Sequence, residues 1–341
     1  MSNMVVAQEI SKPLETALRV GPLRLNGRAF LAPMSGVTDI AMRRIARRFG
    51  AALVVTEMVA CESWLGGSDE AALRSEGRGV SPHVVQLVGR DPKAFAQAAR
   101  RAQDAGAAMI DINMGCPARR VAGGLAGSAL MREPQRALQI IASVIEAVGL
   151  PVSVKMRLGW DEACLNAPEL ARRAQDLGAA MVSVHGRTRQ QFYRGRADWA
   201  AVRQVVQTVD IPVVVNGDCS GLDDAKAMLA ASGAAAVMIG RAAVGAPWIV
   251  GAIGRALSHG GAVILPSIEL RQAAAVEHLQ SLLSQLGAQA GLRHARKHLA
   301  AYAERAGAAP EHRLALVTAT DPNAAERLLA ACFTQDARQA A

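Results

Sequence analysis

Short apolar runs rich in β-branched residues recur along the first three quarters of the chain, and each precedes a longer Ala- and Leu-rich segment of helical character. The runs lie at 28–33, 53–58, 83–88, 109–113, 151–156, 181–185, 211–216 and 235–240. Because their apolar residues are nearly continuous, each run predicts a strand buried on both faces. Eight strand–helix units predict an α/β fold, a (β/α)8 TIM barrel. The alternative is an open doubly wound sheet, although the first strand–helix turn lacks G-x-G-x-x-G.

The pattern changes after residue 258, where the strand-like runs stop. Ser267 is placed to cap a helix that ends near residue 286, and a second helix is expected over about 291–305. Asp321 followed by Pro322 favours the start of a last helix. We therefore predict a barrel over residues 1–258 and a small all-helical domain over residues 259–341.

Composition narrows the class of protein. With 341 residues, 51% of them hydrophobic, the chain can bury a large core, which excludes a disordered protein. The five cysteines show no C-x-x-C spacing, so we expect neither a disulfide framework nor a metal site. The first 25 residues lack the pattern of a secretory signal, and no stretch is apolar enough to span a membrane. We expect a cytoplasmic protein that contacts no membrane and needs no obligate protein partner.

Small, polar or charged residues follow every predicted strand. In a TIM barrel the carboxyl ends of the strands meet at one rim, where the active site is built. Burying so many polar groups there is unfavourable unless a ligand or a hydrogen-bond network satisfies them. The candidate ligand-binding residues at this rim are Pro33, Met34, Ser35, Gln86, Asn113, Cys116, Lys155, Arg157, His185, Arg187, Asn216, Gly217, Asp218, Gly240 and Arg241.

The ends of the seventh and eighth strands favour a phosphate group as part of the ligand. Each strand ends in a turn of small residues, at Gly217 and Gly240, that leads into a helix, and the backbone N–H groups of such turns bind phosphate in many barrels. Arg241 adds a fork-shaped donor. The alternative is that the two glycines only permit close packing.

Lys155, on the fifth strand, is placed to contact an electron-rich ring bound at the rim. Its ammonium group would stabilise the negative charge that a reduced flavin carries at its N1 and C2 carbonyl region. The alternative is an ion pair between Lys155 and a rim acid, namely Asp111, Asp218 or Glu57.

The residues at this rim match a known family. The chain resembles the bacterial tRNA-dihydrouridine synthases, most closely the B-type subgroup, from about Val20 to the last helices. The motifs that carry the resemblance are "LAPMSGVTD", "VVQLVGRDP", "DINMGCPARRV", "LAGSAL", "VKMRLGW", "VHGRTR", "VVNGD" and "MIGRAAVGAPW". "DINMGCP" with a following "LAGSAL" is the most specific of them.

The resemblance implies an FMN-containing barrel that reduces the C5–C6 double bond of a uridine in tRNA, with NADPH or NADH as the electron donor. Hydride from flavin N5 would reach uracil C6, and Cys116 would give a proton to C5 from the opposite face. Pro33, Met34, Ser35 and His185 would lie against the flavin ring, and Gln86 and Lys155 would bond its polar edge. The ribityl phosphate end would be held by Asn216, Gly217, Asp218, Gly240 and Arg241.

A net charge of +9 is compatible with a nucleic-acid partner. The segment 185–196 interleaves four arginines with Phe192 and Tyr193, which suits contacts to phosphates and an unpaired base, although a solvated arginine-rich loop is the alternative. Arg293 and Lys297 fall on one face of an expected helix. Because residues 262–341 carry nearly equal numbers of basic and acidic side chains, we expect tRNA to contact both domains, with Asn113, Arg157, Arg187, Arg293 and Lys297 binding the substrate.

Two rival functions stay open at this point. A flavin barrel could reduce a free pyrimidine, although the basic loop and the added helical domain argue against it. A non-catalytic RNA-binding protein could have kept the barrel, but the set of Cys116, Lys155 and His185 argues against that reading.

Overall fold

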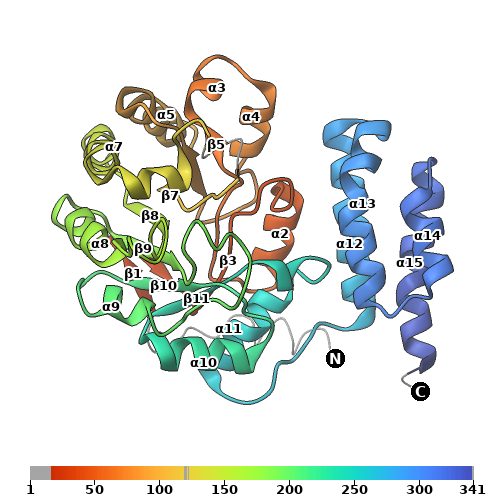
Figure 1. The fold of residues 1–341 in the computed structure, drawn as a ribbon. Helices are drawn as coiled ribbons and strands as arrows, with labels where there is room; N and C mark the ends of the chain where they lie inside the picture. Colours follow the sequence, from red (N-terminus) through yellow and green to blue (C-terminus); the bar gives the residue numbers. More distant parts are fainter. Residues whose placement is uncertain (1–16, 119–120, 122, 340–341) are drawn as a thin grey trace.

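A computed structural model describes residues 17–118, 121 and 123–339 of the chain. Its centre is a closed barrel of parallel strands surrounded by helices (Figure 1). The strands of this sheet are β3 (Ala29–Leu31), β4 (Leu53–Val54), β5 (Val59–Ala60), β6 (Val84–Val88), β7 (Met109–Met114), β8 (Val152–Arg157), β9 (Met181–His185), β10 (Val213–Asn216) and β11 (Ala236–Ile239). Each run expected from the sequence contains a strand.

The strand order closes the sheet on itself. Within it, β3 pairs with both β4 and β11, and the parallel ladder then runs from β11 through β10, β9, β8 and β7 to β6. The second expected strand is broken into β4 and β5, and a bridge from Val55 to Val84 joins this broken strand to β6. The predicted TIM barrel is confirmed, and the open doubly wound alternative is wrong.

The connections between the strands carry the helices that cover the barrel. They are α2 (Ile40–Arg48), α3 (Cys61–Leu65), α4 (Asp69–Ser75), α5 (Pro92–Asp104), η1 (Gly127–Arg132), α7 (Pro134–Ala147), α8 (Ala167–Asp176), α9 (Val202–Val206), α10 (Leu222–Ser232), η2 (Arg241–Ala243) and α11 (Ile249–His259). Typical of them is α5, with Asp91 as N-cap, Pro92 in its first turn, and buried Phe95 and Ala98 on its inner face. The apolar strands and these inner faces form one continuous core.

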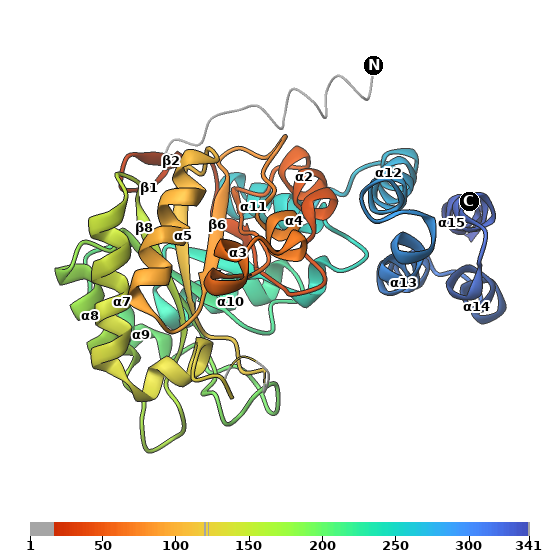
Figure 2. The same cartoon turned by 90° about the horizontal axis from the view of Figure 1, so that it is seen from above.

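A bundle of four helices lies to one side of the barrel, next to α2 (Figures 1 and 2). Its members are α12 (Ile268–Leu286), α13 (Ala288–Arg305), α14 (Pro310–Thr318) and α15 (Pro322–Gln339). Ser267 caps α12 as expected, since its hydroxyl accepts a hydrogen bond from the N–H of Leu270. A separate hydrophobic cluster fills the bundle and extends to Ile45, Phe49 and Trp248 of the barrel, so the two parts share a packed junction.

Two elements were not expected from the sequence. The first is the antiparallel hairpin of β1 (Leu18–Val20) and β2 (Leu23–Leu25), and the second is α14. The expectation that the first 25 residues hold no secretory signal falls partly on residues 1–16, outside the described residues. Among the helices of the described segments, none combines the length and the apolar composition needed to cross a bilayer.

Candidate functional site

A cavity of about 920 Å³ opens at the carboxyl ends of the barrel strands. Its lining residues come from β3, β6, β7, β8, β9, β10 and β11 and from the loops that follow them. This is where the active site of a TIM barrel is expected. The expected site residues that line it are Pro33, Met34, Ser35, Gln86, Asn113, Cys116, Lys155, Arg157, His185, Asn216, Gly217, Asp218, Gly240 and Arg241.

A chain of buried hydrogen bonds runs across the floor of the cavity and ends at Cys116. The Gln86 amide donates to Asp111 at 2.7 Å and accepts from the Asn113 side chain at 2.8 Å. Oδ1 of Asn113 in turn accepts from the backbone N–H groups of Gly115, at 3.2 Å, and Cys116, at 2.9 Å. Asn113 therefore fixes the backbone that carries the half-buried Cys116 thiol.

Lys155 points its ammonium group into the cavity, where it donates to Oδ1 of Asn216 at 3.2 Å. Only 9% of the residue is exposed. Burial, reinforced by the charge of Arg157, lowers the pKa of Lys155 to about 8, although Asp111 and Cys116 act in the opposite direction. Among the described residues, Lys155 bonds an amide and forms no ion pair with a carboxylate, so the alternative of an ion pair with Asp111, Asp218 or Glu57 does not describe this lysine.

His185 also lines the cavity, and its imidazole is neutral. Burial first, and then the positive charges of Lys155, Arg157 and other neighbours, hold the pKa of His185 well below its usual value. Its Nε2 lies 3.3 Å from a guanidinium nitrogen of Arg187. At neutral pH this histidine can therefore contact a ring without adding a charge.

Arg157 ties together the two loops that border the cavity. Its Nε donates to the carbonyl of Gly115 at 2.8 Å, and one terminal nitrogen donates to the carbonyls of Thr188 and Phe192 at 2.9 and 2.8 Å. Its guanidinium group also lies 5.6 Å from the ring centroid of Tyr193. Arg157 lines the cavity, as expected, but most of its donors hold loops in place.

The Asp218 carboxylate lies between the guanidinium groups of Arg187 and Arg241. It accepts from Arg187 at 2.6 and 3.0 Å and from Arg241 at 2.7 Å. Burial acts to raise the pKa of Asp218, but the hydrogen bonds and charges of these partners lower it below the usual value. An ionised carboxylate here orients Arg187 and Arg241.

Arg187 is the one predicted rim residue that does not line the cavity. This arginine is 1% exposed and does not line the cavity, because Asp218 and the carbonyls of Arg194 and Gly195 take up its donors. The expected direct contact with substrate does not fit this position. Arg293 and Lys297 are exposed on α13, as expected, but lie outside the cavity.

Arg305, the last residue of α13, lines the cavity although the sequence did not single it out. Its guanidinium group donates to the carbonyl of Ala242 at 2.9 Å and so reaches from the helical bundle to the rim. Met58 also lines the cavity, in the break between β4 and β5. A basic residue at the end of a helix gives no sequence signal of its own.

Comparison with known proteins identifies the family. The family model described as "Dihydrouridine synthase (Dus)" matches residues 30–338, which covers the barrel and nearly all of the helical bundle. The chain belongs to the dihydrouridine synthase family. Its B-type resemblance is matched by a "tRNA-dihydrouridine synthase B" of Xanthomonas axonopodis pv. citri, 41% identical over 90% of this chain and 93% of that protein.

Two other relatives of this dihydrouridine synthase are more similar to it. A "Probable tRNA-dihydrouridine synthase" of Rhodobacter capsulatus is 49% identical over 92% of this chain and 97% of that protein. Another, from Rhizobium leguminosarum bv. phaseoli, is 47% identical over 88% of this chain and 93% of that protein.

Solved structures of low sequence identity share the barrel fold of this dihydrouridine synthase. The old yellow enzyme homologue from Zymomonas mobilis aligns with a TM-score of 0.50 and 16% identity over 76% of this chain and 96% of that one. The 6-hydroxypseudooxynicotine amine oxidase of Pseudomonas geniculata aligns with a TM-score of 0.55 and 12% identity. That alignment covers 82% of this chain and 52% of the oxidase.

Proposed function

We propose that this dihydrouridine synthase uses FMN and NAD(P)H to reduce the C5–C6 double bond of specific uridines in tRNA. The observation that carries the proposal is one cavity that holds a cysteine, a buried lysine, a neutral histidine and, at one end, the guanidinium group of Arg241. A tRNA substrate assigns the reaction to the cytoplasm.

The residues of the cavity fit FMN. At the end formed by the loops after β10 and β11, the backbone N–H groups of Asp218 and Cys219 have no acceptor within the described residues, and Arg241 stands beside them. N–H groups and a guanidinium group of this kind are suited to a phosphate. At the other end, Lys155 offers a cation to the polar edge of the flavin, and Gln86 lies on the neighbouring wall. The roles assigned to Pro33, Met34, Ser35, Asn216, Gly217 and Gly240 stay predictions.

The protein residues then have distinct tasks in the reaction. When bound, FMN supplies hydride to uracil C6. The Sγ–H of Cys116 gives a proton to C5, and Asn113 holds the Cys116 backbone in place through its two accepted hydrogen bonds. Lys155 keeps a positive charge close to the ring system, and the neutral His185 packs against it without adding a second cation.

The rim has features that suit a uridine turned out of folded RNA. Phe192 and Tyr193 are 40% and 50% exposed, contact one another at 4.8 Å between ring centroids, and line the cavity. Aromatic side chains at an opening can stack on an extruded base. Arg305 brings the helical bundle to the same opening, so RNA that enters the cavity would touch both parts of the chain.

The proposal is tested by comparing tRNA with a free pyrimidine as substrate. We expect purified protein to be yellow and to release FMN on denaturation. With NADPH, it should form dihydrouridine in an unmodified tRNA transcript and leave free uracil unchanged. Turnover of free uracil without turnover of tRNA would favour the free-pyrimidine reductase, and a colourless, inactive protein would favour a non-catalytic RNA-binding role.

The exposed face of α13 provides a further prediction about tRNA binding. We expect Arg293→Ala with Lys297→Ala to weaken tRNA binding and to reduce the slope of log affinity against log salt by about 1 to 2, because each phosphate contact releases counterions. Filter binding over a salt series measures this slope. Arg172→Ala with Arg173→Ala on α8, on the barrel exterior, is the matched control. An unchanged slope in the α13 variant would remove this face from the interface.

A further inference from the structure

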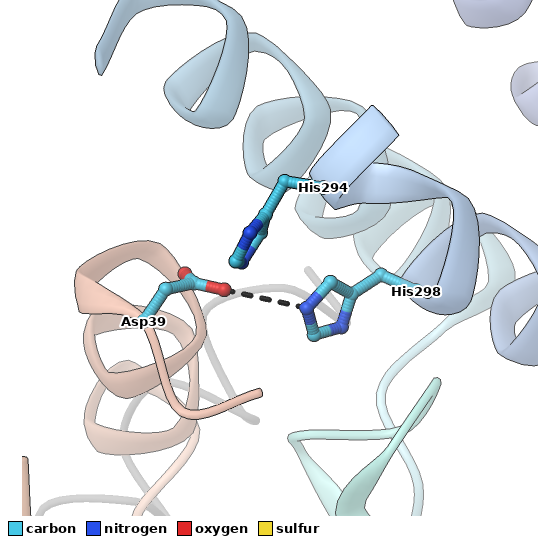
Figure 3. Close-up of side chains that lie close together, drawn as sticks. All are labelled: Asp39, His294 and His298. Carbon is cyan, nitrogen blue, oxygen red and sulfur yellow. Dashed lines mark ion pairs between the residues drawn. The ribbon is translucent and has the colours of Figure 1, made fainter. Parts of the chain in front are cut away.

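A cluster of ionisable side chains lies outside the cavity, where the barrel meets the helical bundle. Asp39 comes from the start of α2, and His294 and His298 come from α13 (Figure 3). His278 of α12 and Tyr302 of α13 complete the cluster from behind. None of these residues lines the proposed active-site cavity, so the proposed function does not use them.

Asp39 is a buried anion whose two oxygens have different tasks. Oδ1 accepts from the N–H of Met42 at 3.0 Å and so caps α2. Oδ2 lies 3.0 Å from Nε2 of His278 and 3.4 Å from Nε2 of His298. The cap fixes the orientation in which Oδ2 faces the bundle.

His294 and His298 are spaced like the histidine pair of a helical metal site. Residues at i and i+4 lie on one face of a helix, and two histidines at this spacing are a familiar zinc-binding arrangement. Figure 3 shows both rings turned toward Asp39. The Nε2 atoms of both histidines are buried. Within the described part of the chain, that of His294 has no hydrogen-bond partner, and that of His298 makes only the 3.4 Å ion-pair contact with Asp39. His298 is only 2% exposed, and the long 3.4 Å contact with Asp39 satisfies its buried nitrogen poorly.

The ligand types at this point favour a cation. Two imidazole nitrogens and a carboxylate oxygen are groups that bind Zn²⁺ in proteins, and here all three come from side chains that face one another.

We propose that Asp39, His294 and His298 form a binding site for a divalent transition metal ion of the Zn²⁺ class. Their three ligand atoms lie within 4.8 Å of one another. Ligand atoms at about 2.0–2.1 Å from a tetrahedral Zn²⁺ are about 3.3 Å apart, and the Asp39–His298 pair, at 3.4 Å, already has this spacing. His294 is only half-buried, so an ion can reach the three ligands from solvent on that side.

His278 and Tyr302 support the site from the second coordination sphere. Nε2 of His278 donates to Oδ2 of Asp39, and Nδ1 of His278 lies 3.0 Å from the Tyr302 hydroxyl. Hydrogen bonds of this kind orient metal-binding carboxylates and strengthen the site. The ion would join α2 to α13 and thereby hold the helical bundle against the barrel loop that carries Met34 and Ser35.

The test is metal binding by full-length, tag-free, FMN-loaded protein after dialysis against a chelator. Titration with Zn²⁺ is expected to give about one bound ion per chain and to raise the Tm. His294→Ala should weaken Zn²⁺ binding by about 100-fold or more and abolish the rise in Tm, while the flavin stays bound. His259→Ala, at an exposed histidine on the end of α11, is the matched control and should bind like the wild type.

Two results would overturn the proposal. One is a wild-type protein that takes up no stoichiometric Zn²⁺, which would leave the cluster as a hydrogen-bonded link only. The other is equal binding by wild type and His294→Ala, which would assign the ion to another place. Because His294 is half-exposed and its Nε2 has no hydrogen-bond partner within the described residues, the alanine variant should fold normally. A failure to bind Zn²⁺ therefore reports on the ligand itself.

Discussion

Replacement of Cys116 by alanine is expected to lower dihydrouridine formation by about 100- to 10,000-fold, the range over which a positioned general acid contributes. The thiol is half-buried at the cavity, and its backbone is held by Asn113 and by Ser128, whose hydroxyl donates to the Cys116 carbonyl at 2.8 Å. FMN binding and NADPH oxidation should continue in the variant, since the residues proposed to hold FMN, such as Lys155 and Arg241, are unchanged and Asn113 bonds the backbone of residue 116 rather than its thiol. Only protonation at uracil C5 is removed.

A single-turnover assay separates these steps. The flavin of the variant is reduced first, tRNA is added, and both flavin reoxidation and dihydrouridine are followed. Cys164→Ala is the matched control, because Cys164 is another partly exposed free thiol and lies outside the cavity. If Cys116→Ala reacted at the wild-type rate at neutral pH, the proton would have to come from a different group.

The long elements of the fold could be predicted because each carries a continuous burial pattern. Strands such as β7 and β8 are buried at every position, so their apolar residues stand close together in the sequence even where polar residues such as Asp111 and Lys155 interrupt them. The hairpin of β1 and β2 has three residues in each strand, and α14 buries only Leu316, so neither leaves a pattern of sufficient length.

The break in the second strand depends on contacts that the sequence does not display. Between β4 and β5, the Thr56 hydroxyl bonds the carbonyl of Glu57 at 2.7 Å and also accepts from the N–H of Gln86 at 2.9 Å. Glu57 accepts from the N–H of Gly36 in the loop after β3. Side-chain hydrogen bonds thus replace part of the ladder, and an apolar run alone cannot reveal this.

The position of the site could be predicted, but the pairing of its side chains could not. The strand-end rule places Gln86 and Asn113 at the rim, yet only the structure shows that they bond one another and that the chain ends at Cys116. The role of Arg187 could not be predicted either. Its donors bond groups within the protein because the loop that follows brings the carbonyl of Gly195 to its guanidinium group. The Asp39 cluster gives only a partial signal in the sequence: His294 and His298 stand four residues apart on one helix, but Asp39 is distant in the chain and only the fold brings it to them.

Lys155→Met is expected to stabilise the FMN-free protein while it lowers activity. Burial has brought the pKa of Lys155 down from 10.5 to about 8, so at pH 7 the folded protein holds a charge that burial disfavours. At 1.36 kcal/mol per pKa unit, removing this charge should raise the free energy of unfolding at pH 7 by about 3 kcal/mol. Between pH 8 and 10.5 the unfolded chain binds more protons at this lysine than the folded protein, so wild-type stability rises with pH. The advantage of the variant should therefore shrink over that range.

The same substitution removes the cation that the cofactor's polar edge would face. We expect the rate of flavin reduction by NADPH to fall by about 100- to 1,000-fold, because a positioned positive charge in a buried site stabilises developing negative charge strongly. Urea unfolding of the FMN-free protein at several pH values and stopped-flow flavin reduction measure the two effects. Lys93→Met, at an exposed lysine of α5, is the control and should change neither.

A loss of stability in Lys155→Met would mean that its bond to Asn216 outweighs the cost of the buried charge. An unchanged reduction rate would remove Lys155 from the polar edge of the flavin. A gain in stability together with a loss of rate would identify Lys155 as a charge that the fold tolerates for the sake of the ligand.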